Sequence, residues 1–311
     1  MHIKWDDLSI AEWYAIYNQL PKSNIVQTYA YAKAMRQIHF QDTGFGVIKN
    51  TGGDPMGLVQ AQYVSSFGFK RFFIDRGPLW IKPNNFNHQR QFWELIATER
   101  PKSFLSKRRF IPEIDYSPYA LKLFEKLGFN HKADGYQTIW LNLDPDLADL
   151  EKNLDKSWRG ALNKARKSSL EIKLDPHSHD LERLLKKYTH DRFKKKYAGA
   201  SPKLVRAMER YKSEYENSFI ISATDENGKV CAMMYFWIHG TSATYQIGWS
   251  DKNGRTHNAH NLMMWRAIEH LKPQNINWLD LGGINTDKAE GVTRFKSGLN
   301  GEIFISAGIF C

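Results

Sequence analysis

The chain has 311 residues, a formal net charge of +11, 42% apolar residues and 14% aromatic residues. This composition supplies ample apolar surface for packed cores, excludes a largely disordered chain, and suits two domains of about 150 residues each. No stretch of about 18 uninterrupted apolar residues occurs, and no apolar run follows the first lysine at the N-terminus. We therefore expect neither a membrane span nor a signal peptide, and hence a cytoplasmic protein. The two cysteines, Cys231 and Cys311, are too few for a disulfide framework or a four-ligand zinc site.

The first half of the chain predicts an antiparallel meander followed by a helix. Phe45–Tyr63 is typical of a strand, a glycine-rich turn and a second strand, and Phe69–Trp80 predicts a further strand pair. Ser117–Phe129 then predicts a short amphipathic helix with Gly128 at its C-terminal cap. The ending of this helix, F-E-K-L-G-F, resembles an element found near the C-terminus of GNAT N-acyltransferase domains.

The second half of the chain repeats this plan. Phe219–Ile238 predicts a strand, an Asn-Gly turn and a strand, Ala243–Trp249 predicts the next strand, and Ala259–Leu271 predicts the helix. We therefore expect an α/β (α+β) fold of two tandem GNAT-like domains, residues 1–145 and 146–311. Each domain is expected to contain a mixed, mostly antiparallel sheet flanked by helices.

The positive charge is concentrated between Lys152 and Lys196. This region holds fourteen Lys and Arg residues against six Asp and Glu residues, a local balance of +8. Its densest part predicts a basic helix face that suits the phosphates of a tRNA or of a nucleotide-diphosphate head group. The alternative is a face that is merely solvated, because acidic residues are interleaved. The candidate phosphate-binding residues are Lys156, Arg159, Lys164, Arg166 and Lys167.

The segment Asn277–Gly301 carries the strongest functional signal. It predicts a short buried strand that ends at Leu281, then a double glycine that allows close approach of the backbone to a ligand, and later the pair Phe295–Lys296. When an amine attacks an ester, negative charge develops on the carbonyl oxygen, and a fixed cation such as Lys296 stabilises that charge. The alternative is a surface lysine beside a core phenylalanine.

Two further residues of the second half are candidates with an equally simple structural explanation. Asp280 can assist proton removal from the attacking amine, or it can be a structural carboxylate that caps the glycine turn. Tyr245, next to the strand glycine Gly248, can line a cleft or belong to the core.

The order D-L-G-G at Asp280–Gly283, followed by a Phe-Lys pair, resembles the signature of the FemABX family. These are aminoacyl-tRNA-dependent transferases that build peptide bridges on peptidoglycan precursors. Asn24–Met35 and Arg76–Trp80 resemble two N-terminal elements of the same family. The resemblance implies transfer of an amino acid from aminoacyl-tRNA to an amine of a peptidoglycan precursor or related peptide, with no cofactor. The implied catalytic residues are Lys296, Phe295 and Asp280.

The sequence departs from the family pattern on the side of the acyl acceptor. Tyr31 stands where the family has tryptophan, Met35 where it has a phosphate-binding lysine, and Ile111 where it has an acidic residue. Neighbouring residues of the right chemistry are therefore the candidates for substrate binding in this half. The full set of candidate substrate-binding residues is Lys33, Arg36, Arg76, Glu113, Asp115, Tyr245, Gly282 and Gly283.

Two other functions remain open from the sequence: an acyl-CoA-dependent N-acyltransferase acting on a sugar or peptide amine, and a non-catalytic RNA-binding protein. The loop Ser250–His260 precedes a helix where a coenzyme A cradle needs glycines, but Asn258 and His260 occupy the decisive positions, which disfavours coenzyme A. His257 and His260 alone do not predict a metal site, because no carboxylate accompanies them.

Overall fold

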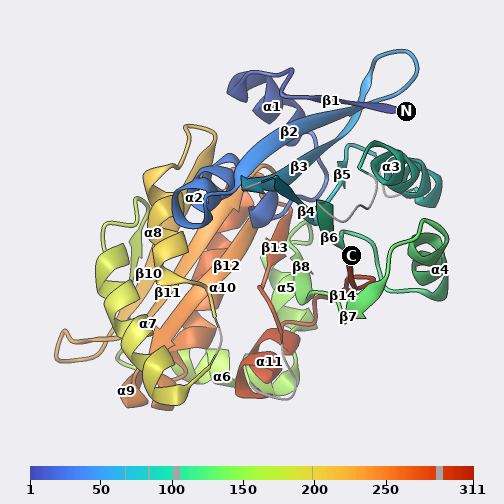
Figure 1. Ribbon diagram of the computed structural model, residues 1–311. Helices are drawn as coiled ribbons and strands as arrows, with labels where there is room; N and C mark the ends of the chain where they lie inside the picture. Colours follow the sequence, from blue (N-terminus) through green and yellow to red (C-terminus); the bar gives the residue numbers. More distant parts are fainter. Residues whose placement is uncertain (67, 83–84, 101–105, 198, 285–289) are drawn as a thin grey trace. The chain divides into compact units, whose positions relative to one another are not determined.

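The computed structural model describes residues 1–66, 68–82, 85–100, 106–197, 199–284 and 290–311. Residues that contact one another group into two compact units (Figure 1). The first unit comprises Met1–Gln137, Arg206–Tyr215 and Phe304–Cys311, and the second comprises Thr138–Val205 and Glu216–Ile303. Among the residues just named, no helix is both long and apolar enough to cross a membrane.

The first unit is built on one mixed sheet with the strand order β1-β2-β3-β4-β6-β15-β7, in which β5 also pairs with β3. Neighbouring strands are antiparallel except β4 and β6, which are parallel. The strands are β1 (His2–Trp5), β2 (Asp42–Lys49), β3 (Pro55–Ser66), β4 (Phe69–Gly77), β5 (Leu79–Trp80), β6 (Ser106–Pro112), β7 (His131–Ala133) and β15 (Ile309–Phe310).

The helices of the first unit start at polar caps that the sequence supplies. Ser9 and Glu12 form a reciprocal capping box at the start of α1, and the Ser117 side chain accepts from the Ala120 N–H at the start of α4. The chain leaves α4 through Gly128, whose φ is +74°, as the sequence predicts. These helical elements are α1 (Ile10–Tyr17), η1 (Ile25–Gln27), α2 (Tyr29–His39), α3 (Phe86–Glu99) and α4 (Pro118–Lys126).

The second unit is built on a sheet with the order β14-β8-β13-β12-β11-β10-β9. Its long central strands are antiparallel, and β12 pairs in parallel with β13. The strands are β8 (Gln137–Asn142), β9 (Glu171–Asp175), β10 (Glu216–Thr224), β11 (Val230–His239), β12 (Ser242–Ser250), β13 (Trp278–Asp280) and β14 (Glu302–Ile305). The helices are α5 (Leu147–Asn153), α6 (Lys156–Arg166), α7 (Leu181–Lys195), α9 (Lys252–Thr256), α10 (Ala259–Leu271), η2 (Lys272–Gln274) and α11 (Glu290–Ser297). Helix α8 (Pro202–Arg210) begins in the second unit, and its residues from Arg206 onward belong to the first.

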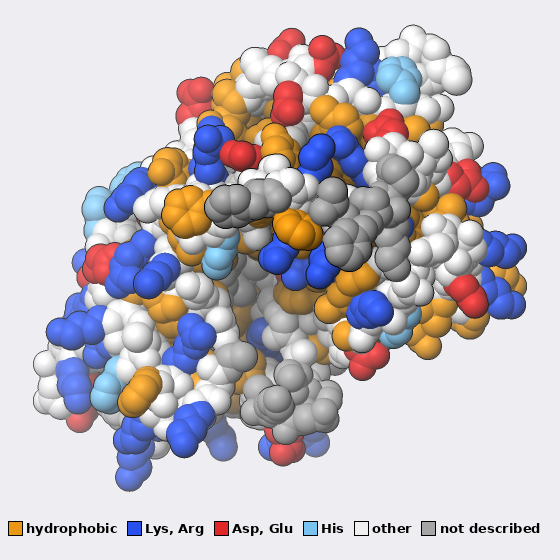
Figure 2. Space-filling model, in the orientation of Figure 1, with side chains coloured by type: hydrophobic (Ala, Val, Ile, Leu, Met, Phe, Trp, Pro, Cys, Tyr) orange, Lys and Arg blue, Asp and Glu red, His pale blue; other side chains and the backbone are white. Residues whose placement is uncertain are grey.

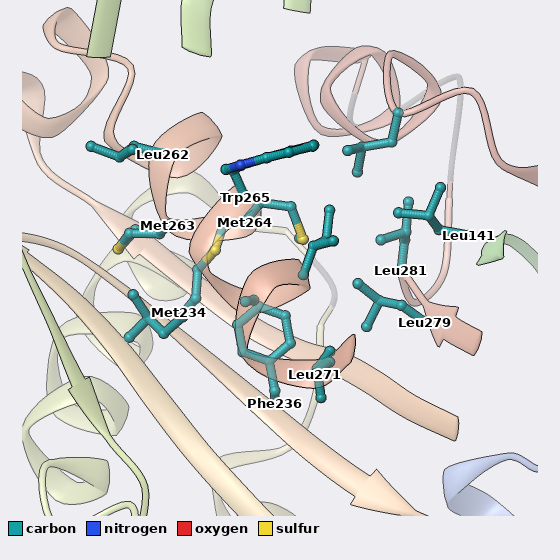
Figure 3. Close-up of a cluster of buried hydrophobic side chains, with 14 of the residues drawn as sticks. Leu141, Met234, Phe236, Leu262, Met263, Met264, Trp265, Leu271, Leu279 and Leu281 are labelled. Atoms are coloured by element: carbon teal, nitrogen blue, oxygen red, sulfur yellow. The ribbon is translucent and has the colours of Figure 1, made fainter. Parts of the chain in front are cut away.

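The core of the second unit lies between one face of this sheet and the helices α6 and α10. Met234 and Phe236 alternate along β11 and are fully buried against residues of α10 such as Met264 (Figure 3). Helix α7 covers the opposite face, where the Lys187 ammonium lies 4.1 Å from the centre of the Trp249 ring. Trp249 pairs in register with Met233, whose side chain points away from α10. The mixed, helix-flanked sheets confirm the predicted fold class.

The division between the units differs from the predicted boundary at residue 145 in three places. Residues 138–142 belong to the second unit, because β8 pairs with β13 in the second sheet. The C-terminal strand β15 belongs to the first unit, because it pairs with β6 and β7. Residues 206–215 also belong to the first unit, where Tyr215 stacks on Tyr14 with ring centres 4.9 Å apart.

Candidate active site

The site of interest in the second unit lies where two parallel strands part. β12 and β13 pair at only three positions, the last of which is Thr244 opposite Asp280. β13 then ends, whereas β12 continues to Ser250. The register of β12 with β11 also shifts here, because Phe236 faces Tyr245 while Tyr235 faces Ile247. This β-bulge bends β12 next to the opening, which is a common position for bulges beside active sites.

The double glycine after β13 is required by the backbone. Gly282 has a φ of +73°, a conformation that residues with a Cβ rarely adopt. A Cβ at this position would also lie 2.9 Å from the carbonyl oxygen of Tyr245 and 3.6 Å from the ammonium nitrogen of Lys296. The D-L-G-G motif therefore turns the chain sharply and brings its carbonyl groups toward Lys296.

Lys296, in the last turn of α11, is a buried cation. Its ammonium donates hydrogen bonds to the carbonyl oxygens of Gly282 at 3.0 Å and Gly283 at 2.8 Å, and its side chain is only 6% exposed. Burial lowers the pKa of Lys296 to about 8, although the nearby charge of Asp280 acts in the opposite direction. A surface lysine does not have this environment, so the alternative of an exposed Lys296 is wrong.

Asp280 stabilises the turn at Gly282 through hydrogen bonds. Its carboxylate is fully buried, and its Oδ1 accepts from the Thr138 hydroxyl at 2.5 Å and from the N–H of Gly282 at 2.8 Å. The Thr138 oxygen also lies 3.0 Å from the Gly282 carbonyl oxygen. This geometry favours the interpretation of Asp280 as a structural carboxylate that caps the glycine turn. Its role as a proton acceptor stays a prediction.

Aromatic side chains lie near Lys296 and its neighbour Phe295. The Tyr245 ring centre lies 5.8 Å from the Lys296 nitrogen, and Trp158 of α6 donates from Nε1 to the carbonyl oxygen of Phe295 at 2.9 Å. The Tyr245 hydroxyl lies directly over Gly248, so that a Cβ at that position would collide with it. Burial raises the pKa of Tyr245 well above its usual value, which keeps the phenol neutral.

His260 of α10 lies beside Phe295, the neighbour of Lys296. Its Nε2 is 3.2 Å from the Trp249 carbonyl oxygen, and its ring centre is 5.9 Å from that of Phe295. Burial lowers the pKa of His260 to about 4, and the charges of Arg255 and Lys195 act in the same direction. The imidazole is therefore neutral at pH 7. The described residues contain no cluster of His, Cys, Asp and Glu able to hold a metal ion.

Sequence reasoning missed Thr138, Trp158 and His260 as parts of this site. Thr138 and Trp158 are more than 130 residues from their partners in the sequence, and no local pattern links them. The sequence suggests His260 only as a possible metal ligand and as a side chain that disfavours coenzyme A, whereas in the structure it packs beside Phe295. The segment 285–289, which connects the double glycine to α11, lies outside the described residues.

Arg76 and Glu113, two of the candidate substrate-binding residues in the first unit, bind one another. The Arg76 guanidinium donates to both carboxylate oxygens of Glu113, at 3.0 and 2.9 Å, and its centre lies 4.5 Å from that of the Tyr136 ring. Arg76 also has a positive φ of +53°. Arg76 thus adopts a strained backbone conformation and also holds Glu113 through two hydrogen bonds. Such strain is often found at functional sites, where the surrounding structure fixes the side chain.

The remaining candidates of the first unit have other surroundings. Lys33 lies over the Tyr29 ring at 5.0 Å, and Arg36 forms an ion pair with Asp42 at 2.8 Å. Asp115 is exposed and its backbone bridges to Ser306. Of the five candidates in the first unit, Arg76 and Glu113 contact one another. The substrate-binding roles of all five residues stay predictions.

The predicted basic helix face exists on α6. Lys156, Lys164 and Lys167 are exposed on this helix. Arg166, however, forms a bidentate ion pair with Glu151 at 2.5 and 2.8 Å. Arg159 donates to the carbonyl oxygen of residue 152 at 3.0 Å. The two arginines are thus engaged within the unit, and the lysines are the accessible cations of this face.

Comparison with known proteins identifies the family of the part of the chain that carries this site. Residues 162–311, with the double glycine and Lys296, match the model of the FemAB family. This region is a FemAB-family sequence. The resemblance that the D-L-G-G and Phe-Lys motifs indicate is thereby confirmed. No curated protein sequence matches the chain.

Solved structures extend the structural similarity to the whole chain. The crystal structure of FemX superposes with a TM-score of 0.79 at 13% identity, over 99% of this chain and 96% of that one. The C-terminal domain of a putative lysylphosphatidylglycerol synthetase from Agrobacterium fabrum gives 0.55 at 12% identity, over 97% and 92%. A tandem GNAT protein from the clavulanic acid biosynthesis pathway gives 0.53 at 10%, over 99% and 98%. At these identities the similarity establishes the fold, two tandem GNAT-type units.

Proposed function

We propose that this FemAB-family protein is an acyltransferase that moves an amino acid from aminoacyl-tRNA to an amine of a peptidoglycan precursor or a related peptide. The family match and the tandem GNAT-type fold support acyl transfer. The observation that carries the proposal is the buried ammonium of Lys296, held between the carbonyl groups of Gly282 and Gly283 beside the parted strands.

The chemistry needs little beyond this arrangement. The attacking nitrogen forms a bond to the ester carbonyl carbon, and the resulting tetrahedral intermediate carries negative charge on the former carbonyl oxygen. When the bond to the ribose oxygen breaks, that oxygen takes up a proton and the new amide nitrogen has lost one. The ester is already activated, so the protein has to position the amine, exclude water and stabilise the charge.

Lys296 is suited to stabilise this charge. An ammonium has three donors, and two of them are directed to the carbonyl oxygens of residues 282 and 283, which leaves the third for the oxyanion. Because a pKa of about 8 still leaves the amine mainly protonated at pH 7, the cation is present before the substrate arrives. A fixed donor in a buried site stabilises a developing charge without reorganisation of water.

Asp280 and Thr138 contribute by fixing the turn. The carboxylate holds the N–H of Gly282 while the hydroxyl of Thr138 lies near the Gly282 carbonyl oxygen, so the two groups together set where that carbonyl points. The direction of this carbonyl in turn sets the position of the Lys296 ammonium. In this proposal Asp280 and Thr138 are positioning residues.

The second candidate keeps the fold and changes the donor to an acyl-CoA. The shared fold with a tandem GNAT protein and the parting of β12 from β13 favour it. The segment before α10 argues against it. Gly254 there is buried, and a Cβ at its position would lie 2.5 Å from the carbonyl oxygen of Cys231, so this glycine serves packing and not phosphate approach. Asn258, with a φ of +54°, carries a side chain at the start of α10.

One transfer experiment separates the two donors. The purified protein is incubated with a charged tRNA pool that carries labelled amino acids and with a peptide amine acceptor, with and without RNase, and acetyl-CoA binding is measured by isothermal titration. We expect RNase-sensitive transfer and no acetyl-CoA binding below millimolar concentration. Micromolar acetyl-CoA binding together with RNase-resistant transfer would establish the acyl-CoA donor instead.

A further inference from the structure

The C-terminal turn of α7 exposes an aromatic ring among cations. Phe193 is 85% exposed, the highest value among the exposed large apolar side chains of the described residues. Its neighbours Arg192, Lys194, Lys195 and Lys196 are all basic, so that four cations and no acidic residue surround it in five consecutive positions. Lys and Arg side chains gather over this part of the second unit in Figure 2.

These cations differ in how they are engaged. Lys195 forms an ion pair with Asp191 at 2.9 Å, and Arg192 donates to the carbonyl oxygen of Ala200 at 3.3 Å. Lys194 and Lys196 are exposed and form no ion pair with any residue in the described ranges. Favourable interaction with the helix dipole explains cations at a helix C-terminus. It does not explain why an apolar ring is left in water between them.

This turn lies close to the proposed reaction site. The Lys195 charge helps to lower the pKa of His260, which packs beside Phe295, so Lys195 is near enough to act on that imidazole. About two turns before Lys195 on α7, Lys187 lies over Trp249 of β12. Helix α7 therefore connects the open end of β12 to a basic, aromatic surface.

We propose that the C-terminal turn of α7, residues 192–196, binds the unpaired nucleotides that carry the aminoacyl ester, with a base stacked on Phe193 and phosphates near Lys194 and Lys196. This inference rests on the proposed aminoacyl-tRNA donor. An exposed aromatic ring beside accessible cations is the combination that single-stranded nucleic acids need, because every base offers a face for stacking and every linkage carries a negative charge.

The binding test uses two RNA hairpins of identical stem, one with a short unpaired 3′ end and one blunt, each labelled for fluorescence anisotropy. We expect the full-length protein to bind the tailed hairpin about tenfold more tightly, and Phe193→Ala to abolish this preference. Tyr119→Ala is the matched control, because Tyr119 is 76% exposed on the basic helix α4 of the first unit. It is expected to bind as the wild type does.

The transfer test compares aminoacyl-tRNA with an aminoacyl adenosine, which has no other nucleotide. Phe193→Ala, and separately Lys194→Ala with Lys196→Ala, should lower kcat/KM for aminoacyl-tRNA about tenfold and leave that for aminoacyl adenosine within twofold. Equal loss with both donors would contradict the proposal, because the turn would then act on the reaction and not on the nucleotides.

Three other outcomes overturn either this inference or the proposed function on which it rests. Tailed and blunt hairpins that bind the wild type equally exclude stacking at this surface, whatever the transfer assay shows. Absence of transfer from both donors with an intact, Phe193-dependent hairpin preference overturns the proposed function and leaves the RNA surface in place. If Phe193→Ala releases the protein from anionic lipid vesicles and leaves hairpin binding unchanged, the turn is a membrane contact.

Discussion

The ammonium of Lys296 lies 3.0 Å from the carbonyl oxygen of Gly282, so the cation is positioned by backbone. A carbonyl dipole attracts the ammonium without neutralising it, and the charge stays available to a substrate. Gly282 itself is fixed by its positive φ and by the hydrogen bond of its N–H to Asp280. Substitution of a residue that holds the Gly282 turn, such as Asp280 or Thr138, should therefore shift the Lys296 ammonium.

Replacement of Lys296 by methionine should lower turnover about 100-fold or more, as expected when an oxyanion-stabilising group is lost. The fold should be retained, because the substitution also removes a charge whose burial is unfavourable, as the lowered pKa shows. Steady-state transfer rates and urea unfolding test both statements. Lys126→Met, at an exposed position on α4, is the control. Activity of Lys296→Met within a factor of three of wild type removes Lys296 from the mechanism.

The pH dependence of transfer should report the same group. The lysine is active as the ammonium, and its pKa is lowered to about 8, so kcat/KM should fall as the pH rises above about 8. Deprotonation of the acceptor amine raises the rate at lower pH, which gives a bell-shaped profile. In Lys296→Arg the residual activity should lack the alkaline decline, because a guanidinium keeps its charge to above about pH 12. An unchanged alkaline limb in that variant assigns the decline to another group.

Thr138→Val should reduce both activity and stability. The substitution keeps the shape of the side chain and removes the hydroxyl that donates to buried Asp280, and loss of a hydrogen bond to a charged group costs about 1.5–3 kcal/mol. We expect a rate loss of about tenfold, mainly in kcat, because the turn that positions Lys296 is loosened. Thr138→Ser preserves the hydroxyl and should stay within threefold. If valine and serine behave alike, the hydroxyl is not what holds the turn.

His260 should make the second unit sensitive to acid. Its pKa is about 4 in the folded protein, below the usual value of 6.5, so the unfolded chain binds this proton more readily. The contribution to stability is present above pH 6.5 and is lost as the pH falls toward 4, by at most about 3 kcal/mol. His260→Asn should flatten the decline in urea midpoint between pH 6.5 and 4. The exposed His2→Asn serves as the comparison, and identical slopes for the two variants would contradict the assignment.

If the basic face of α6 binds the phosphates of tRNA, the affinity for tRNA should depend steeply on salt concentration. Lys164 and Lys167 are exposed on this helix, so Lys164→Ala with Lys167→Ala should lower the slope of log affinity for tRNA against log salt by about one to two units. Arg166 is left unchanged, because its pair with Glu151 also contributes to the fold. Lys122→Ala with Lys126→Ala on α4 provides an equal change of net charge elsewhere. If the salt dependence of tRNA binding does not change, the basic face of α6 is merely solvated and does not bind phosphate.

Local patterns were sufficient to predict much of this fold. The Asn-Gly turn between β10 and β11 and the glycine-rich turn between β2 and β3 fix hairpins from a few adjacent residues, and both hairpins are present. The buried strand before Gly282 and the turn at Gly282 likewise follow from a contiguous motif. In each case the decisive residues are neighbours in the chain, and their backbone requirements can be inferred directly.

The remaining parts of the site depend on pairings between distant segments. Thr138 contacts Asp280 only because β8 pairs with β13, and no feature of either strand's sequence predicts this pairing. The same holds for Trp158 and the carbonyl group of Phe295, and for Arg76 and Glu113. Exposed lysines and paired arginines on α6 were also indistinguishable in the sequence, since the partner Glu151 lies on another helix.

The placement of β15 has a consequence for how the protein is made. In the first sheet this strand fills the position between β6 and β7, although its residues are Ile309 and Phe310 and those of its neighbours lie before residue 134. A nascent chain that has emerged from the ribosome as far as residue 300 therefore still lacks one strand of its first sheet. Synthesis and folding run in different orders here, because the first sheet is completed by a strand that is translated after every strand of the second sheet.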